Sequence, residues 1–543
     1  MKESVLVVKK FFYYIVATSF TISLLGWVTK EEANSVFSID KGINSIEIKE
    51  SAHMEIIEAD FDLGEKSFIT DLGNTVYYNV RGLASVPKKE GKYPVVLIVH
   101  GRYNNSSNET RFDKGFKYLT DYLASNGYAV FTLDIQGAYN ESFGKEDDNK
   151  KVRNMFPSFI EAFEDANNGV IQGFSVDLTD TLDLDNIVLI GHSRGGETAI
   201  DIALENENIK GIVSVAPTLP NELNREYPDI PISIIVPEFD GDVDGLDGVS
   251  LFDSITLDKS RTKDAELIFL ENGNHNWFNS MLTKNDVLSL NDMEKINSQI
   301  SREEQEIFLK NFCKDFLGGI FNEKKEGILY NYNTFEPSYM YGLEVKIQSW
   351  TKKQSLLLDY NNISEISYEG LDINILREGK SYDIDETNGF VLPLQSIDGF
   401  NYKDLINIKW KDRLGRVEIP INNINLKKYN SLVFNLAVDS SDELNIKDQH
   451  QSFTIRLEDN RGNISDIVLG DNSQALDYVE GTFVYTKYLE EIKHFWSSYI
   501  VLSDISIPLK EFQGVNLKNI AKVTLLFDKT DSGSIMINSI KFY

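Results

Sequence analysis

A serine stands between two glycines in the run Val188-Leu189-Ile190-Gly191-His192-Ser193-Arg194-Gly195-Gly196-Glu197-Thr198-Ala199. The apolar residues before the glycine predict a strand, and the residues from Glu197 to Glu205 predict a helix. Gly191 and Gly195 have a mechanical role in such a turn, because a strand and a helix approach each other closely there. The pattern is that of a nucleophile elbow, and Ser193 is the first candidate catalytic residue.

A serine hydroxyl is a poor nucleophile at neutral pH, so it needs a base that removes its proton. The chain has six histidines. His275 follows the apolar run Leu267 to Leu270 within Asn272-Gly273-Asn274-His275-Asn276-Trp277-Phe278, so it belongs to a loop at the end of a predicted strand. The other five lie inside the elbow, directly before Gly101, or outside the α/β pattern: His192, His100, His53, His450 and His494. We therefore predict that His275 is the base.

The acid that orients this histidine is expected between the serine and the histidine in chain order, after the strand Ile232 to Val236. Asp240 is a short turn beyond that strand, and Asp242 is the alternative acid. A calcium loop is a competing interpretation, because Asp240, Asp242 and Asp244 alternate before a glycine. Leu251 occupies the twelfth position of that loop, where a calcium site would have a glutamate.

An oxyanion hole requires backbone N–H groups beside the carbon under attack. The residue after the nucleophile, Arg194, supplies one donor in this pattern. The loop after the predicted strand Tyr93 to Val99 is expected to supply the second, from Arg102 or Tyr103.

Apolar strands alternate with helical stretches from residue 68 to residue 320, which predicts a doubly wound, mostly parallel α/β sheet. Helices are expected at 112–124, 156–167, 198–204 and 301–317, and strands at 75–86, 93–99, 128–133, 187–190, 209–215, 232–236 and 267–270. Residues 335–543 change to alternating strands separated by Asp, Asn and Gly turns, which predicts a β-sandwich accessory domain. Residues 343–425 are either part of that sandwich or a separate β unit.

The balance of acidic and basic residues limits the kinds of molecule that the chain is expected to bind. The chain has 84 acidic and 54 basic residues and a formal net charge of -30, which argues against nucleic acid. Cys313 is the single cysteine, so neither an intrachain disulfide nor a cysteine-rich metal site is available.

The N-terminus has the pattern of an export signal. Lys2, Lys9 and Lys10 precede an uncharged, mostly apolar run from Phe11 to Val28. This run is long for a signal peptide and short for a membrane span. We expect residues 1–35 to be either a cleaved signal peptide or an N-terminal anchor, with the rest of the chain outside the cytoplasm.

The motifs Val99-His100-Gly101, Gly191-His192-Ser193-Arg194-Gly195-Gly196, Asp240 and Asn274-His275 resemble, in this order, those of an α/β-hydrolase. The elbow is similar to that of the branch that contains chlorophyllases, dienelactone hydrolases and acetylhydrolases. The start His100-Gly101-Arg102 and the turn Asp240-Gly241-Asp242-Val243 are similar to those of large secreted bacterial hydrolases. This resemblance implies a serine hydrolase that needs no cofactor. Glu238 stands where the branch commonly has a glycine before the acid, so the choice among Asp240, Asp242 and Asp244 stays open.

The C-terminal part resembles a galactose-binding-like sandwich in its closing strands. Its tryptophans are either core residues or flat surfaces for sugar rings: Trp350, Trp410 and Trp496. A contact with carbohydrate or with a cell surface is therefore expected from this region.

These observations predict an exported enzyme that cleaves an ester bond, in a small molecule or a polymer, through an acyl-enzyme on Ser193. A serine peptidase or amidase with the same three residues is the enzyme alternative. A non-catalytic protein that binds a surface through its β region is the alternative outside enzymes.

Overall fold

The computed structural model describes residues 45–49, 53–103, 110–140, 147–170, 172–220, 225–243, 247–286, 297–321, 338–376, 391–393, 403–421, 424–469, 473–479, 482–485 and 496–543. The predicted export signal at 1–35 and Asp244 lie outside these residues. Within them, no helix is both long enough and apolar enough to cross a membrane.

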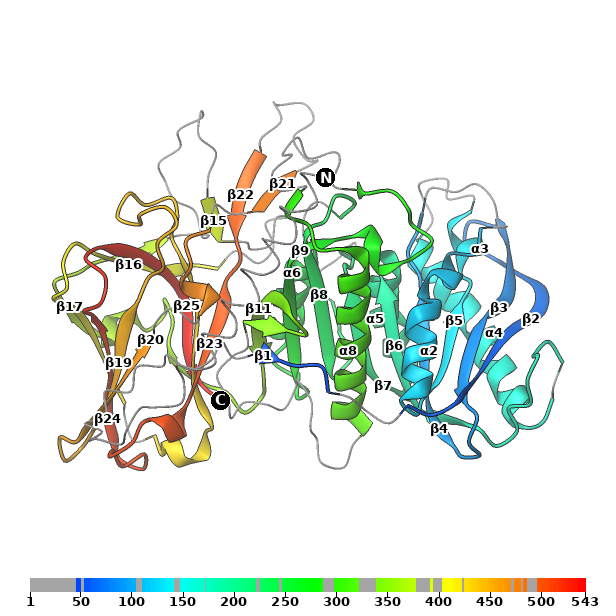
Figure 1. Ribbon diagram of the computed structural model, residues 1–543, viewed down its shortest axis with the longest axis horizontal. Coiled ribbons are helices and arrows are strands. Elements are labelled where there is room, and N and C mark those ends of the chain that lie inside the picture. Colours follow the sequence, from blue (N-terminus) through cyan, green and yellow to red (C-terminus); the bar gives the residue numbers. More distant parts are fainter. Residues whose placement is uncertain are drawn as a thin grey trace, which may run out of the picture. The chain divides into compact units, whose positions relative to one another are not determined.

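The first sheet has eleven strands in the order β1-β10-β11-β9-β8-β7-β6-β4-β5-β3-β2 (Figure 1). Their bounds are β1 (Ser45–Ile46), β2 (Ile56–Ile69), β3 (Thr75–Pro87), β4 (Tyr93–Val99), β5 (Ala129–Leu133), β6 (Leu182–His192), β7 (Ile209–Val215), β8 (Ile232–Phe239), β9 (Ala265–Asn274), β10 (Tyr339–Met340) and β11 (Leu343–Trp350). The pairs from β5 through β4, β6, β7 and β8 to β9 are parallel, whereas β2, β3 and β11 pair antiparallel with their neighbours. The predicted α/β sheet is thus mostly parallel at its centre.

Helices cover both faces of this sheet. Their bounds are η1 (Phe112–Phe116), α2 (Lys117–Ser125), α3 (Gln136–Tyr139), α4 (Asp148–Asn167), α5 (Arg194–Leu204), α6 (Asp247–Leu257), η2 (Asn276–Phe278) and α8 (Arg302–Phe321). Successive residues of β4 alternate between two cores: Val95 and Leu97 pack with α4, α5 and α6, whereas Val96 and Ile98 pack with α2 and α8. Because successive side chains of a strand point to opposite faces, an apolar strand with helices on both sides is buried on both faces.

Two predicted helices begin earlier in the structure than in the sequence pattern. The helix predicted from Phe156 begins at Asp148, where the side chain of Asp147 accepts a hydrogen bond from the N–H of Asn149 (3.0 Å). The helix predicted from Thr198 begins at Arg194, directly after the serine. Polar or small residues fill both first turns, so apolar periodicity did not reveal them.

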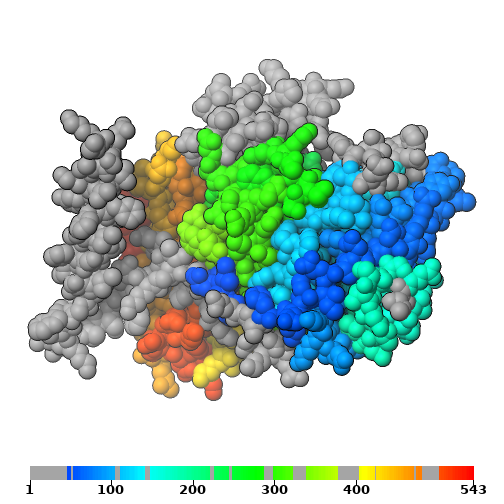
Figure 2. Space-filling model, turned by 45° about the vertical axis from the view of Figure 1, so that its right-hand side comes forward, coloured from blue at the N-terminus to red at the C-terminus, as the bar shows by residue number. Residues whose placement is uncertain are grey.

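The strand β11 belongs to the first sheet, which the sequence pattern did not indicate. It pairs antiparallel with β9 over six residue pairs, from Val345 opposite Leu270 to Trp350 opposite Ala265. The strand β1 pairs with β10, and Lys49, which follows β1, accepts a hydrogen bond at its carbonyl from Lys314 Nζ of α8 (3.0 Å) (Figure 2). The strand that carries His275 at its end is therefore an interior strand of the sheet.

The rest of the C-terminal region consists mostly of antiparallel strands. One sheet has the order β14-β16-β25-β18-β23, with β12 also on β25, and a second has the order β13-β17-β24-β19-β20. Their bounds are β12 (Ser355–Leu358), β13 (Ser367–Glu369), β14 (Asp372–Leu376), β16 (Leu405–Trp410), β17 (Gly415–Pro420), β18 (Ser431–Val438), β19 (Phe453–Asp459), β20 (Ile464–Leu469), β23 (Ser503–Pro508), β24 (Ile520–Phe527) and β25 (Gly533–Phe542). A third sheet contains β15 (Val391–Pro393), β21 (Thr482–Tyr485) and β22 (Trp496–Ile500).

Trp410 shows how the two larger sheets pack. It is on β16, is buried, and has its ring centroid 4.6 Å from that of Phe527 on β24. The packing of these rings is consistent with a β-sandwich. Trp410 is therefore a core residue, and Trp350 packs partly buried against the α/β core, beside Arg261. The side chain of Trp496 lies outside the described residues.

Candidate active site

Ser193 occupies the turn between β6 and α5 with φ 57° and ψ −127°. A non-glycine residue with such angles is strained, and strain of this kind is found at functional sites. A methyl group on Gly191 would lie 2.1 Å from the carbonyl oxygen of Gly195, and one on Gly195 would lie 2.4 Å from the carbonyl oxygen of Val99. Both glycines are thus required by the close approach of backbones, as the sequence pattern predicted.

His275 and Asp240 come together at the ends of two neighbouring strands. Asp240 follows β8 and His275 follows β9, and these strands are parallel. Asp240 Oδ2 lies 2.8 Å from His275 Nδ1, and both side chains are buried. The other oxygen of Asp240 accepts hydrogen bonds from the N–H groups of Asp242 (3.1 Å) and Val243 (2.6 Å). These two donors fix the carboxylate so that it faces the imidazole.

The second nitrogen of His275 lies near Asp242, which lines the cavity described below. His275 Nε2 is buried and neither accepts nor donates a hydrogen bond within the described residues. The hydrogen bond from Ser193 to His275 is therefore not formed in this structure. Its charged neighbour is Asp242, whose Oδ2 lies 3.5 Å away. Catalytic hydrogen bonds often form only when substrate is bound, so this geometry is compatible with a base.

Three carboxylates surround the imidazole. Burial lowers the pKa of His275, but Asp240, Asp242 and Asp286 outweigh it and raise the pKa to about 9. Asp286 itself is buried, which raises its pKa to about 6, and its carboxylate accepts a hydrogen bond from the N–H of Gly241 (2.8 Å). No sequence pattern singles out Asp286, because it follows His275 in a polar stretch without periodicity.

His192, which precedes the serine, forms a hydrogen bond with the backbone of His275. Its Nε2 donates to the carbonyl oxygen of His275 (3.0 Å), and its Nδ1 accepts from the hydroxyl of Tyr103 (2.7 Å). Burial, followed by the nearby charge of His275, holds the pKa of His192 well below its usual value. A neutral His192 with one donor and one acceptor thus connects the loop after β4 to the backbone of His275.

The loop after β4 lies against the serine. A methyl group on Gly101 would lie 2.6 Å from Ser193 Cβ, so the backbone passes directly beside the nucleophile candidate. His100 Nδ1 donates to the carbonyl of Gly101 (2.8 Å), and its Nε2 accepts from the N–H of Ile135 (3.1 Å). These bonds hold the segment in which Arg102 and Tyr103 were predicted to supply an oxyanion donor. Arg194, the other predicted donor, is the first residue of α5, where helix geometry leaves N–H groups without a helical acceptor.

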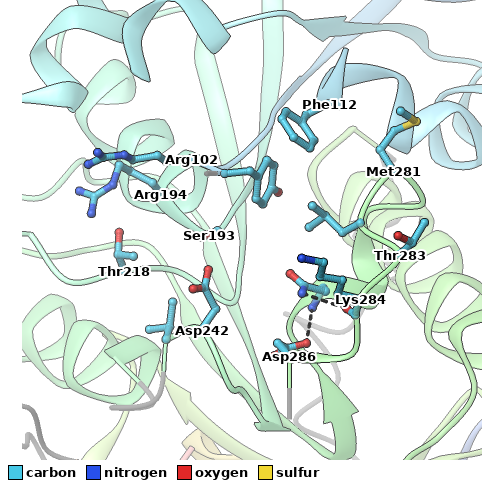
Figure 3. Close-up of a pocket in the computed structure, with 14 residues that line it drawn as sticks. Arg102, Phe112, Ser193, Arg194, Thr218, Asp242, Met281, Thr283, Lys284 and Asp286 are labelled. Carbon is cyan, nitrogen blue, oxygen red and sulfur yellow. Dashed lines mark hydrogen bonds between the residues drawn. The ribbon is translucent and has the colours of Figure 1, made fainter. Parts of the chain in front are cut away.

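A cavity of about 550 Å³ opens above Ser193 (Figure 3). Arg102 and Arg194 form one wall and lie side by side in Figure 3. Lys284 and Asp286 lie close together in Figure 3, and Asp242 lies near Ser193 and Thr218. The remaining lining is mostly apolar or uncharged: Tyr103, Phe112, Thr218, Val243, Asn276, Met281, Leu282 and Thr283. The volume is in the range of pockets that hold small organic ligands.

The calcium interpretation does not fit Asp240. Both of its carboxylate oxygens already face donors, namely His275 on one side and two backbone N–H groups on the other. The part of the chain that the structure describes contains no group of three metal-ligating side chains. Asp244 lies outside that part.

Comparison with known proteins identifies part of this region. Residues 94–234 match the family described as alpha/beta hydrolase fold. A stretch of 128 residues is 29% identical to chlorophyllase type 0 of Chenopodium album and covers 23% of this chain and 32% of the chlorophyllase. The chain thus matches about a third of the length of this curated relative. These similarities support an α/β-hydrolase fold for this part of the chain.

Proposed function

We propose that the α/β-hydrolase domain is a serine hydrolase that cleaves ester bonds with Ser193, His275 and Asp240. The observation that carries this proposal is the strained elbow of Ser193 at a cavity that Asp242 also lines, together with a buried His275 that lies between Asp242 and Asp240, with Asp240 Oδ2 2.8 Å from His275 Nδ1. A chance arrangement of a surface histidine does not account for this geometry, because His275 and Asp240 are both buried. Burial of two ionisable groups is costly unless they pair.

In the proposed reaction, Ser193 Oγ attacks the carbonyl carbon of the ester, and His275 Nε2 takes the hydroxyl proton. Asp240 stabilises the imidazolium that forms, because its carboxylate faces Nδ1. The negative charge that develops on the carbonyl oxygen is stabilised by the N–H of Arg194 together with that of Arg102 or Tyr103. His275 then returns the proton to the leaving alcohol.

The ester bond to the alcohol breaks in this step, and an acyl group remains on Ser193. A water molecule attacks the acyl carbon in the second half-reaction while His275 again accepts a proton. The carboxylic acid leaves, and the serine hydroxyl is restored. No step requires a cofactor.

Labelling of the full chain by a fluorophosphonate probe tests the activated serine. We expect the intact protein to label and both Ser193→Ala and His275→Ala to lose the label. Ser214→Ala is a matched control, because Ser214 is buried on β7 outside the cavity lining. Absence of labelling in the intact, folded protein would refute the proposal.

An amidase or peptidase would use the same groups, because an amine leaving group also requires proton delivery. Parallel assays with p-nitrophenyl esters and peptide anilides separate the two. We expect ester hydrolysis to dominate, and a higher kcat/KM on anilides would reassign the enzyme as an amidase.

We also propose export of this protein, on the basis of the N-terminal lysines and apolar run. Fractionation of expressing cells, with and without residues 1–35, tests this. Retention of the full chain in the cytoplasm would contradict the proposal.

A further inference from the structure

Two arginines form one wall of the cavity. Both belong to backbone segments that lie next to Ser193. Arg194 directly follows Ser193, and Arg102 follows the Gly101 backbone that touches Ser193. Their side chains are 32% and 41% exposed, and both line the cavity (Figure 3). The two guanidinium groups therefore present donors to whatever enters.

The carboxylate that pairs with Arg102 also pairs with a second cation, so it does not fully neutralise the arginine. Arg102 Nη1 donates to Asp148 Oδ2 (3.0 Å), but the other oxygen of Asp148 accepts from the buried Lys151 (3.0 Å). One carboxylate thus serves two cations. Because Lys151 is almost fully buried while Arg102 reaches the cavity, the lysine is the structural partner of Asp148 and the arginine is the exposed one.

Arg194 is less tightly paired than Arg102. Its Nη1 lies 3.8 Å from Glu197 Oε2, which is beyond hydrogen-bond distance. Glu197 accepts a hydrogen bond from the hydroxyl of Thr218 (2.6 Å), and burial raises the pKa of Glu197 to about 7. Its negative charge is therefore incomplete at neutral pH, and the wall has an excess of positive charge in a chain whose net charge is -30.

The rest of the lining has a different character. Its charged residues are Asp242, Asp286 and Lys284, so the two carboxylates outnumber the one cation, and Phe112, Met281 and Leu282 supply apolar surface. An anionic group is repelled from the aspartates and attracted to the arginines, whose planar donors match a carboxylate. These contacts define one orientation for a ligand that has an anionic end and an apolar body.

We propose that the substrates of this site are esters that carry a free carboxylate, which Arg102 and Arg194 bind while the apolar part lies against Phe112, Met281 and Leu282. This inference rests on the proposed function for catalysis, but binding of the carboxylate does not require an active serine. The arginine side chains select the substrate. The backbone N–H of Arg194 keeps its separate role at the oxyanion.

Matched ester pairs that differ only in charge test this selection. One pair is 4-acetoxybenzoate and 4-acetoxybenzamide, with the carboxylate on the leaving alcohol. The other is the mono-4-nitrophenyl ester of adipic acid and its primary amide, with the carboxylate on the acyl side. We expect kcat/KM to favour the carboxylate in at least one pair by roughly tenfold or more, since a charged hydrogen bond contributes that much discrimination.

Substitution of the arginines tests whether they cause the preference for the carboxylate ester. Arg102→Gln and Arg194→Gln should each lower the carboxylate-to-amide ratio by roughly tenfold, whereas lysine at either position should retain part of it. Arg416→Gln is the matched control, because Arg416 is an exposed arginine of β17 that pairs with Glu369. Equal rates within both pairs, or a preference that survives both arginine substitutions, would overturn the inference.

A binding measurement separates this inference from the proposed function. Calorimetric titration of Ser193→Ala with 4-hydroxybenzoate and with 4-hydroxybenzamide reports recognition without turnover. Tighter binding of the carboxylate, lost in Ser193→Ala combined with Arg102→Gln and Arg194→Gln, supports the anion site even if no ester is cleaved. If the fluorophosphonate labels Ser193 but neither the two ester pairs nor this ligand pair favours the carboxylate, the carboxylate inference fails and the hydrolase proposal stands.

Discussion

Asp242 Oδ2 lies 3.5 Å from His275 Nε2, whereas Asp240 Oδ2 lies 2.8 Å from the other ring nitrogen, Nδ1. Asp242 is 55% exposed, so its carboxylate reaches the imidazole from the solvent side. The contact favours the protonated imidazole, which cannot act as a base. In the proposed mechanism, Asp242 therefore opposes activity at neutral pH.

The first prediction concerns the pH dependence of kcat/KM. With a His275 pKa of about 9, only about one part in a hundred of the imidazole is neutral at pH 7. Because the neutral form is the base, kcat/KM should rise with pH through a midpoint near 9. Asp242→Asn removes a carboxylate that raises this pKa, so the midpoint should move to lower pH and activity at pH 7 should increase several-fold.

The measurement is a pH profile of ester hydrolysis between pH 6 and 10 for the intact protein and for Asp242→Asn. Asp531→Asn, on an exposed aspartate of the β region, is the control and should leave the midpoint unchanged. A midpoint that stays in place or moves to higher pH in Asp242→Asn would contradict the assigned role.

The second prediction separates the two candidate acids. Asp240→Asn removes the charge that stabilises the imidazolium, and we expect kcat to fall by roughly 10³- to 10⁴-fold. Asp242→Asn should retain activity at pH 10, where His275 is neutral in either protein. The measurement is kcat of the two variants at pH 10. A larger loss of kcat in Asp242→Asn than in Asp240→Asn would make Asp242, and not Asp240, the acid that stabilises the imidazolium.

The third prediction concerns the elbow. Gly191→Ala places a methyl group 2.1 Å from the carbonyl oxygen of Gly195, so strand and helix must separate. The free energy of unfolding should fall by at least about 2 kcal/mol, as for overpacking of a tight core. Gly462→Ala is the control: it has φ 81° but no atom near the added methyl, so it should lose only about 1 kcal/mol. Urea unfolding measures both, and equal losses would contradict the packing argument.

The fourth prediction concerns β11. A chain of residues 1–321 lacks this strand and leaves β9, which ends at Asn274 beside His275, at an open edge of the sheet. We expect it to aggregate and to label poorly with the fluorophosphonate, because an exposed apolar edge strand pairs with other chains. A chain of residues 1–352 keeps β11 and is the matched comparison. Equal solubility and labelling of the two would show that β11 is dispensable for the site.

Sequence patterns were sufficient to predict the central strands, because the side chains on both faces of those strands are apolar. The predicted range Ile209–Val215 coincides with β7, and Tyr93–Val99 coincides with β4. The first turns of α4 and α5 were not predicted, because Asp148 to Lys151 and Arg194 to Gly196 lack the apolar spacing of a helix. Asp148 pairs with Arg102 of the cavity lining, and Gly195 is required by the close approach of the β4 backbone, so neither turn is built from apolar side chains.

The sequence by itself predicted the α/β order of elements and singled out Ser193 and His275, because strand burial, the glycine elbow and the position of a histidine after a strand are local features. It left the acid open among three aspartates, since residues two positions apart on a loop are equivalent until the loop folds. Only the tertiary structure turned Asp240 towards Nδ1 and Asp242 towards Nε2. It also placed Arg102 beside Arg194 and joined β11 to β9, because contacts between distant segments depend on how the whole sheet pairs and not on any local pattern.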